Sequence, residues 1–221
     1  MRLSVVIPTL NAAVFLPLTL ASLEGAGDVV VVDGGSADGT VELASRLGAR
    51  AAAAPMGRGR QLMAGAAAAR GDWLLFLHAD TQLDPGWKQA VEMFRADPAN
   101  RNKAAVFRFA LDDPSPRARR LERIVAWRVR WMGLPYGDQG LLIHRDFYHA
   151  LGGFKPLPLM EDVDLMRRIG RARLVVLPIA ARTSAERWRR DGWLLRSFRN
   201  LTCLALYFAG VSPRLIKRLY G

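Results

Sequence analysis

The chain has few of the residues that build disulfide-bonded or zinc-stabilised proteins. Its 221 residues include one cysteine, Cys203, and three histidines. A single cysteine excludes an intramolecular disulfide, and the sequence has no C-x-x-C pair or Cys/His cluster for a structural zinc. We therefore expect a reducing compartment, and a cytoplasmic location is the prediction.

Long apolar runs are also missing. The N-terminal stretch "MRLSVVIPTLN" has a short apolar run that is broken at Pro8, which indicates a first strand rather than a signal peptide. Near the C-terminus, "LTCLALYFAGV" is well short of the roughly 20 residues that a membrane-spanning helix needs. Neither export nor a spanning helix is expected.

Acidic residues are outnumbered. The chain has 32 Lys and Arg against 20 Asp and Glu, a formal net charge of +12. Nucleic acid, acidic lipid headgroups and diphosphate substrates all fit this charge, and so does a solvated basic face. From Arg182 to Gly221 there are eight arginines and one lysine against Glu186 and Asp191. This segment also holds the apolar run, so it is either a helix lying on an anionic membrane surface or a helix packed on the core.

Strand and helix signals alternate through the first half of the chain. With 51% hydrophobic residues, the chain is long enough to bury one sizeable core. The β-branched runs "LSVVIP" and "DVVVVDGG" are typical of parallel strands covered on both faces. Helices are predicted over 12–27, 36–49 and 57–70, the second capped by Ser36 or Asp38, before the strand "DWLLFLHAD". This alternation predicts an open parallel sheet whose ligands bind beyond the carboxyl ends of its strands.

The second half has a more mixed pattern. The stretch "KAAVFRFAL" alternates apolar with polar residues and predicts a strand exposed on one side, followed by a long basic helix over 116–133. A strand over 140–144, helices over 145–153 and 161–170, and a strand over 173–178 are predicted next. The predicted fold is therefore α/β, an open mixed sheet with helices on both faces, plus a C-terminal helical basic segment.

Acidic residues stand where the predicted strands end. Asp33 and Asp80 each close an apolar run, and Glu161 and Asp162 begin a predicted helix. All of these sites fall at the edge of the sheet where a ligand is expected. Each also has a purely structural explanation, since aspartates are common in turns and acids are favoured in a first helical turn.

Four motifs, taken together, resemble a known family. "VVIPTLN", "VVVDGGSADGT", "LLFLHADT" and "PLMEDVDL", with "YGDQG" between the last two, are similar to the inverting glycosyltransferases of family 2. The resemblance covers roughly residues 1–190 and implies a GT-A, Rossmann-like domain. Residues 1–100 would then bind the nucleotide sugar, residues 101–190 would hold the acceptor and the catalytic group, and residues 191–221 would form an amphipathic basic helical segment.

The resemblance implies a nucleoside-diphosphate sugar donor, UDP- or GDP-linked. The residues that match the family's nucleoside site are Pro8, Thr9, Asn11, Asp33 and Gly34, and Leu10 stands where many members carry an aromatic residue. Arg58 and Arg60 lie at a glycine-flanked helix start, where arginine forks and the helix N-terminus suit a diphosphate. Either arginine could instead face solvent.

The resemblance also implies a divalent metal. The triplet His78, Ala79, Asp80 stands where the family has its DxD signature, so Asp80 is the predicted ligand of Mn²⁺ or Mg²⁺. His78 replaces the first aspartate. It either touches ribose or phosphate or is a buried histidine at a strand end.

Asp162 matches the family's general base, which removes the proton of an acceptor hydroxyl as its oxygen attacks the anomeric carbon. Glu161 would orient the acceptor or the base, and Asp164 is an alternative acid. Further predicted acceptor-side residues are Asp138, Gln139, Arg187 and Trp188. "SAERW" resembles the QxxRW motif of processive synthases, but Ser184 replaces its glutamine, so the prediction is a non-processive enzyme with a hydroxyl acceptor, free or lipid-linked.

Two other classes are considered. A sugar-nucleotide nucleotidyltransferase should have a glycine-rich loop after the first strand, where this chain has "PTLNAAVF". A nucleic-acid-binding protein would explain the charge but not the acids at strand ends. We therefore expect no nucleic-acid partner, and a cytoplasmic enzyme with peripheral contact to the inner membrane face.

Overall fold

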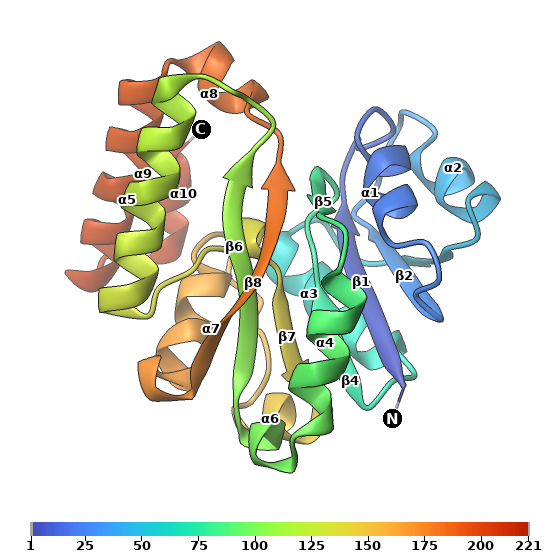
Figure 1. The fold of residues 1–221 in the computed structure, drawn as a ribbon. Coiled ribbons are helices and arrows are strands. Elements are labelled where there is room, and N and C mark those ends of the chain that lie inside the picture. Colours follow the sequence, from blue (N-terminus) through green and yellow to red (C-terminus); the bar gives the residue numbers. More distant parts are fainter. Residues whose placement is uncertain (1, 221) are drawn as a thin grey trace.

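Parallel strands form the N-terminal half of one sheet. The computed structural model describes residues 2–220, and its strands are β1 (Leu3–Thr9), β2 (Asp28–Asp33), β3 (Arg50–Ala53), β4 (Trp73–Phe76), β5 (Thr81–Leu83), β6 (Ala104–Leu111), β7 (Leu141–His144) and β8 (Leu174–Thr183). Within residues 2–220 the strand order is β3-β2-β1-β4-β7-β6-β8-β5 (Figure 1). β3, β2, β1 and β4 are parallel, and β7 is antiparallel to both β4 and β6. The predicted open mixed sheet is confirmed.

Helices cover both faces of this sheet. Their bounds are α1 (Leu16–Ser22), α2 (Thr40–Arg46), α3 (Arg58–Ala68), α4 (Trp87–Ala96), α5 (Pro116–Met132), α6 (Arg145–Ala150), α7 (Glu161–Ile169), α8 (Glu186–Asp191), α9 (Trp193–Phe208) and α10 (Pro213–Tyr220), with 3-10 turns η1 (Pro98–Asn102), η2 (Gly137–Gln139) and η3 (Arg171–Arg173). α1, α2 and α4 pack on one face of the sheet, and α3, α6 and α7 pack on the other.

Strand β1 shows why its apolar run is continuous. Val5 and Ile7 enter the core beneath α1 and α4, whereas Val6 enters the core beneath α3. Alternate side chains of a strand point to opposite faces, so a sheet covered on both sides needs apolar residues at every position. α3 packs tightly against β1 at Gly65, where a Cβ would come within 2.2 Å of Val6.

Two predictions for single strands were wrong. β6 is buried on both faces except at Arg108: Ala104 and Val106 enter one core, Ala105 and Phe107 enter the core on the other face, and Phe109 and Leu111 pack against α5. β4 ends at Phe76, so His78 and Asp80 lie in the turn that follows rather than in the strand, and the short edge strand β5 comes next.

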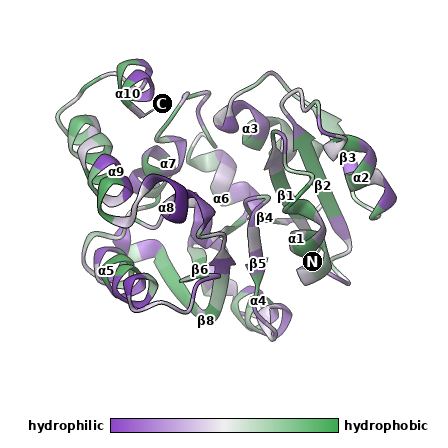
Figure 2. Ribbon diagram, turned by 90° about the horizontal axis from the view of Figure 1, so that it is seen from above, coloured by the Kyte–Doolittle hydropathy of each residue, from purple (hydrophilic) through white to green (hydrophobic). Residues whose placement is uncertain are grey.

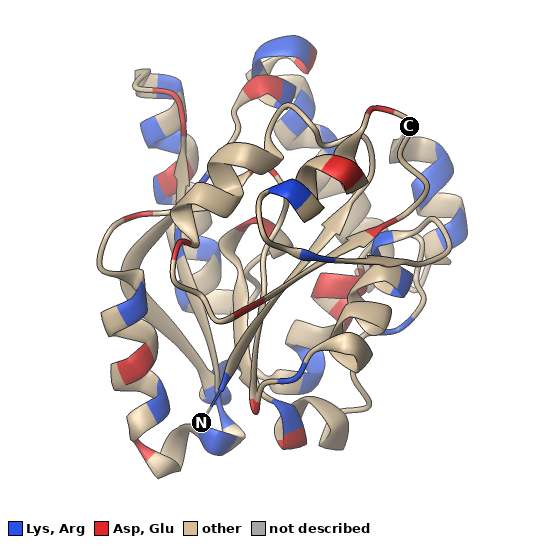
Figure 3. Ribbon diagram, turned by 90° about the vertical axis from the view of Figure 1, so that its right-hand side faces the viewer, with Lys and Arg blue, Asp and Glu red and all other residues tan. Residues whose placement is uncertain are grey.

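The C-terminal helices gather on one side of the molecule. α8, α9 and α10 lie with α5 beyond the β6–β8 part of the sheet (Figures 1 and 2). In Figure 3, Lys and Arg recur along the helix that leads to the C-terminus. None of the helices within residues 2–220 combines the length and the apolar character that crossing a bilayer requires.

Candidate active site

Two adjoining hollows lie at the carboxyl edge of the parallel strands. The outer cleft, of about 380 Å³, is bordered by the end of β1, the start of α3 and the turn after β4. The inner pocket, of about 100 Å³, is bordered by that turn, η2, the start of α7 and helices α8–α10. Arg58, His78 and Asp80 border both hollows. A ligand in the outer cleft and a ligand in the inner pocket would therefore meet at these side chains, which border both hollows together with Leu159, Ser184, Arg187 and Tyr220.

Asp33 holds the loop beside the outer cleft. Its register places it opposite Thr9, whose hydroxyl donates to Asp33 Oδ1 at 3.0 Å. The backbone N–H groups of Gly35 and Ser36 donate to Oδ2 at 2.8 and 2.7 Å, and the Ser36 hydroxyl donates to Oδ1. Burial raises the pKa of Asp33, but these hydrogen bonds outweigh it and bring the pKa below its ordinary value.

The place of Asp33 in the nucleoside site stays a prediction. Its carboxylate accepts four hydrogen bonds from the protein itself. Asn11 is also engaged: its side-chain oxygen accepts from the N–H of Ala37, and its backbone has φ of 50°. Pro8, Thr9 and Asn11 border the outer cleft, as does the exposed Leu10. Gly34 is buried behind this edge, with its N–H donating to the Thr9 carbonyl.

Arg58 is held at the first position of α3 by a buried carboxylate. Its Nε atom lies 2.8 Å from Oε1 of Glu161, whose side chain is 2% exposed. Burial raises the pKa of Glu161, and the Glu161 carboxylate in turn raises the pKa of Arg58. Glu161 was predicted to orient the acceptor or the base, but here it fixes the arginine. Arg60, two residues on, is exposed and does not border either hollow.

His78 is fixed as a neutral imidazole. Its Nε2 atom lies 3.2 Å from Nη1 of Arg58, and because an arginine can only donate, Nε2 accepts. Burial, with the charges of Arg58 and Arg187, lowers the pKa of His78 well below its ordinary value. Gly137 makes room for the ring, since a Cβ there would come within 2.5 Å of Nε2.

Asp162 presents its carboxylate to the inner pocket. It occupies the first turn of α7, where Oδ2 accepts from the N–H of Gly137 at 2.9 Å and Oδ1 accepts from the N–H of Val163 at 2.7 Å. Asp138 faces the same pocket, and its buried Oδ1 has no hydrogen-bond partner within the described residues. Burial raises the pKa of the Asp138 carboxyl to about 7.

Gln139 points away from the pocket. It is 2% exposed, and its amide donates to the carbonyl of Phe107 at 2.9 Å. It supports the sheet from within, and the structure does not bring it to the predicted acceptor side.

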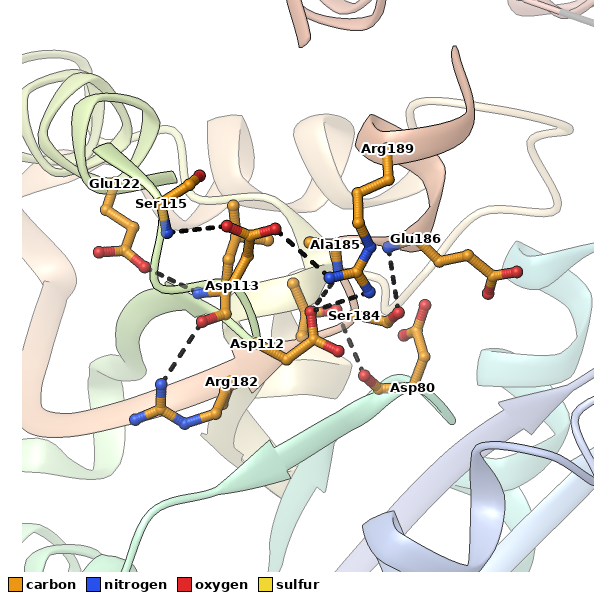
Figure 4. Close-up of polar contacts among 12 residues, drawn as sticks. Asp80, Asp112, Asp113, Ser115, Glu122, Arg182, Ser184, Ala185, Glu186 and Arg189 are labelled. Carbon is orange, nitrogen blue, oxygen red and sulfur yellow. Dashed lines mark hydrogen bonds and ion pairs between the residues drawn. The ribbon is translucent and has the colours of Figure 1, made fainter. Parts of the chain in front are cut away.

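Asp80 lies in a turn that is tied to α8. Its carbonyl accepts from the N–H of Ser184 at 3.1 Å, while the N–H of Ala185 donates to Asp112 at 2.6 Å. Figure 4 shows the loop at Ser184 and Ala185 held by these two contacts, and none of the contacts drawn involves the Asp80 carboxylate. The anchored loop starts α8, and α8 brings Arg187 and Trp188 to the inner pocket. Their part on the acceptor side stays a prediction.

The Asp80 carboxylate fits a metal that is bound mainly by a substrate. Within residues 2–220 no group of three or more His, Cys, Asp or Glu could hold an ion alone. The Nε2 atom of His78 is directed at Arg58. Mg²⁺ is commonly held by one or two carboxylates together with substrate phosphates, and Asp80 meets that requirement.

The C-terminal helices supply pocket residues that the sequence does not reveal. Arg196, Asn200 and Cys203 of α9 and Tyr220 of α10 border the inner pocket. Arg196 is 6% exposed, and its guanidinium donates to Asp191 at 2.9 Å and to the Tyr220 hydroxyl. No motif marks these residues, because only the folding back of α9 and α10 brings them to the start of α7.

Solved structures of two other proteins share this fold. The structure of glucosyl-3-phosphoglycerate synthase from Mycobacterium tuberculosis with Mn²⁺, UDP and glucosyl-3-phosphoglycerate has a TM-score of 0.61 at 20% identity, over 81% of this chain and 70% of that chain. S. aureus TarS has a TM-score of 0.65 at 16% identity, over 99% of this chain and 42% of that chain. A TarS structure with UDP-GlcNAc has a TM-score of 0.63 at 16% identity, over 83% of this chain and 59% of that chain.

The open mixed sheet with helices on both faces is a GT-A type fold. The chain belongs to the family described as "Glycosyl transferase family 2", whose model matches residues 4–155. It is therefore a glycosyltransferase, as predicted. The chain spans less than half the length of the TarS chain with which it shares the highest of these TM-scores.

Proposed function

We propose that this glycosyltransferase moves a sugar from a nucleoside-diphosphate sugar to an acceptor hydroxyl, with inversion at the anomeric carbon and with Asp162 as general base. The observation that carries the proposal is the junction of the two hollows, where Arg58, His78 and Asp80 face both. The donor occupies the outer cleft, the acceptor enters the inner pocket, and the anomeric carbon lies at the junction.

Each side chain has a distinct part in this transfer. The acceptor O–H gives its proton to Asp162 while the oxygen forms its bond to the anomeric carbon and the bond to the diphosphate breaks. Both Asp162 oxygens accept a backbone N–H, which fixes the direction of the carboxylate. Arg58, held by Glu161, donates toward the departing diphosphate. His78, held neutral, adds no charge of its own and receives the Arg58 N–H.

A divalent cation, Mg²⁺ or Mn²⁺, would be held by Asp80 and would neutralise charge on the leaving diphosphate. Complexes of the glucosyl-3-phosphoglycerate synthase contain Mn²⁺ or Mg²⁺ with UDP, which supports the cation and a uridine donor here. The TarS complex with UDP-GlcNAc supports the same donor class. The proposed acceptor is a compound with a free hydroxyl group, which is either unattached or linked to a lipid. The protein acts either away from membranes or in peripheral contact with one.

A thermal-shift screen of nucleotide sugars tests this proposal. A donor that binds only the folded protein raises the melting temperature, and it should do so more strongly with Mn²⁺ than with EDTA. Asp80→Asn should remove the difference between Mn²⁺ and EDTA, whereas Asp146→Asn, at an exposed site on α6, should leave it unchanged. If no nucleotide sugar stabilises the protein, the proposed donor class is wrong. If Asp80→Asn keeps the full Mn²⁺ effect, the assignment of Asp80 as metal ligand is wrong.

A further inference from the structure

Helix α9 buries Cys203 and Leu204 but directs five large apolar side chains toward solvent. Leu194 is 88% exposed and Phe198 is 70% exposed, and Leu195, Leu201 and Phe208 are each more than 45% exposed. Leu194, Phe198 and Leu201 follow each other at helical spacing, so they share one face. A helix on the surface of a soluble protein normally places polar residues on this face. The exposed face of α9 is therefore unusual, and an apolar face of this size marks an interaction surface.

Basic helices lie on both sides of α9. Viewed from above, α10, α9 and α5 follow one another along one side of the molecule (Figure 2). α5 exposes Trp127 and Trp131 to 60% and 57%. Its other exposed residues include Arg117, Arg120, Arg123 and Arg130, and α10 exposes Arg214, Lys217 and Arg218.

We propose that α5, α9 and α10 form a membrane-docking surface for an anionic bilayer, with the apolar face of α9 in the interface and the arginines of α5 and α10 on the lipid headgroups. An amphipathic helix that lies in the bilayer plane combines these two features, and tryptophan is enriched at the same depth. The surface adds α5, a helix from the middle of the chain, to the basic C-terminal segment. The sequence alone did not link α5 to that segment.

The charge pattern favours a bilayer over a second copy of the chain. In a two-fold dimer the same patch meets itself, so the basic residues that flank α9 would approach basic residues of the other copy. Like charges across an interface oppose association, whereas acidic headgroups complement them. An anionic lipid surface satisfies the apolar centre and the basic borders together.

The same helix joins this surface to the active site. The buried side of α9 supplies Arg196, Asn200 and Cys203 to the inner pocket. Docking through the exposed side would bring the inner pocket close to the bilayer, which suits an acceptor hydroxyl carried by a lipid. This consequence rests on the proposed function, whereas the docking itself does not.

Co-sedimentation of the full chain with vesicles, without nucleotide sugar, tests the docking. The protein should bind phosphatidylcholine vesicles that contain phosphatidylglycerol more strongly than phosphatidylcholine alone, and added salt should weaken binding. Leu194→Glu with Phe198→Glu should lower the vesicle partition coefficient about 100-fold or more, because two large apolar side chains no longer leave water. Met93→Glu, at a 70% exposed position on α4, is the matched control and should bind as the wild type does.

Several results would overturn the proposal. The first is no vesicle binding by the wild-type protein, and the second is equal binding to both kinds of vesicle. A double variant that is folded by circular dichroism yet binds like the wild type would also overturn it. A dimer in sedimentation velocity that the double variant converts to a monomer, with no vesicle binding, would assign the surface to a second copy instead. Each of these results would leave the donor-binding screen unaffected, so failure of the docking and failure of the proposed function can be told apart.

Discussion

Asp138→Asn should make the protein more stable, and the gain should grow with pH. Burial raises the pKa of this carboxyl from 3.8 to about 7, so the folded protein keeps a proton that the unfolded chain releases. Between these two pKa values the unfolded chain binds fewer protons, and the free energy of unfolding therefore falls as the pH rises. The asparagine variant has the same shape and stays neutral, so it escapes this loss.

The expected size follows from the two pKa values. The raised pKa of Asp138 lowers the free energy of unfolding by about 2 kcal/mol at pH 5 and by about 4 kcal/mol at pH 8, since one pKa unit corresponds to about 1.4 kcal/mol. Urea unfolding of both proteins at pH 5, 6, 7 and 8, with EDTA and without nucleotide, measures the difference. Because the comparison uses the change with pH, it is independent of any constant effect of the amide group.

A difference in stability that stays constant between pH 5 and 8 would refute this reasoning, because it would mean that Asp138 ionises in the folded protein as it does in the unfolded chain. The protonated carboxyl would also act as a hydrogen-bond donor toward a ligand in the inner pocket. Binding of a divalent cation nearby should favour its ionised form, so the pH dependence should weaken with Mn²⁺ and donor.

Two further substitutions test the packing of the site. Gly137→Ala should displace His78 from Arg58 and destabilise the protein by about 1–3 kcal/mol, whereas Gly27→Ala, where a Cβ meets nothing within 4 Å, should be nearly neutral in urea unfolding. Arg58→Gln should cost about 2 kcal/mol by leaving Glu161 buried without its partner, less than for a fully buried pair because Arg58 is 35% exposed. Adding Glu161→Gln to that variant should restore most of the stability but not donor binding. Thermal shifts measured with and without donor would show both effects. A double variant as unstable as the single variant would contradict the pairing of Arg58 with Glu161.

The strands of the first half could be predicted because their pattern is local. A strand that is buried on both faces can be predicted from its β-branched run without knowing which elements cover it. β1 and β2 lie where the sequence predicts them. The burial of β6 could not be predicted in the same way, because the residues that cover Ala104, Val106, Phe109 and Leu111 come from segments later in the chain. Alternation in the sequence was a poor guide to exposure there.

The grouping of the candidate site residues could be predicted in part from the sequence, and their roles stay predictions. Arg58, Asp80 and Asp162 all border the inner pocket, which agrees with the sequence grouping them in one site. The choice between Arg58 and Arg60 depends on which face of α3 meets the cleft, since residues two apart on a helix point in different directions. Arg196 and Tyr220 depend on how α9 and α10 fold back, which no local pattern encodes. The division of the chain at residue 190 stays a prediction.

The role of Asp162 is the most direct point to measure. Asp162→Asn should lower turnover of a stabilising nucleotide sugar about 10²- to 10⁴-fold, because the amide cannot remove a proton. The same variant should keep the donor-induced rise in melting temperature, since Asp162 borders the inner pocket and not the outer cleft. Release of the nucleoside diphosphate, with the best acceptor found or with water, gives the rate. Near-normal turnover by Asp162→Asn would contradict the assignment of the base.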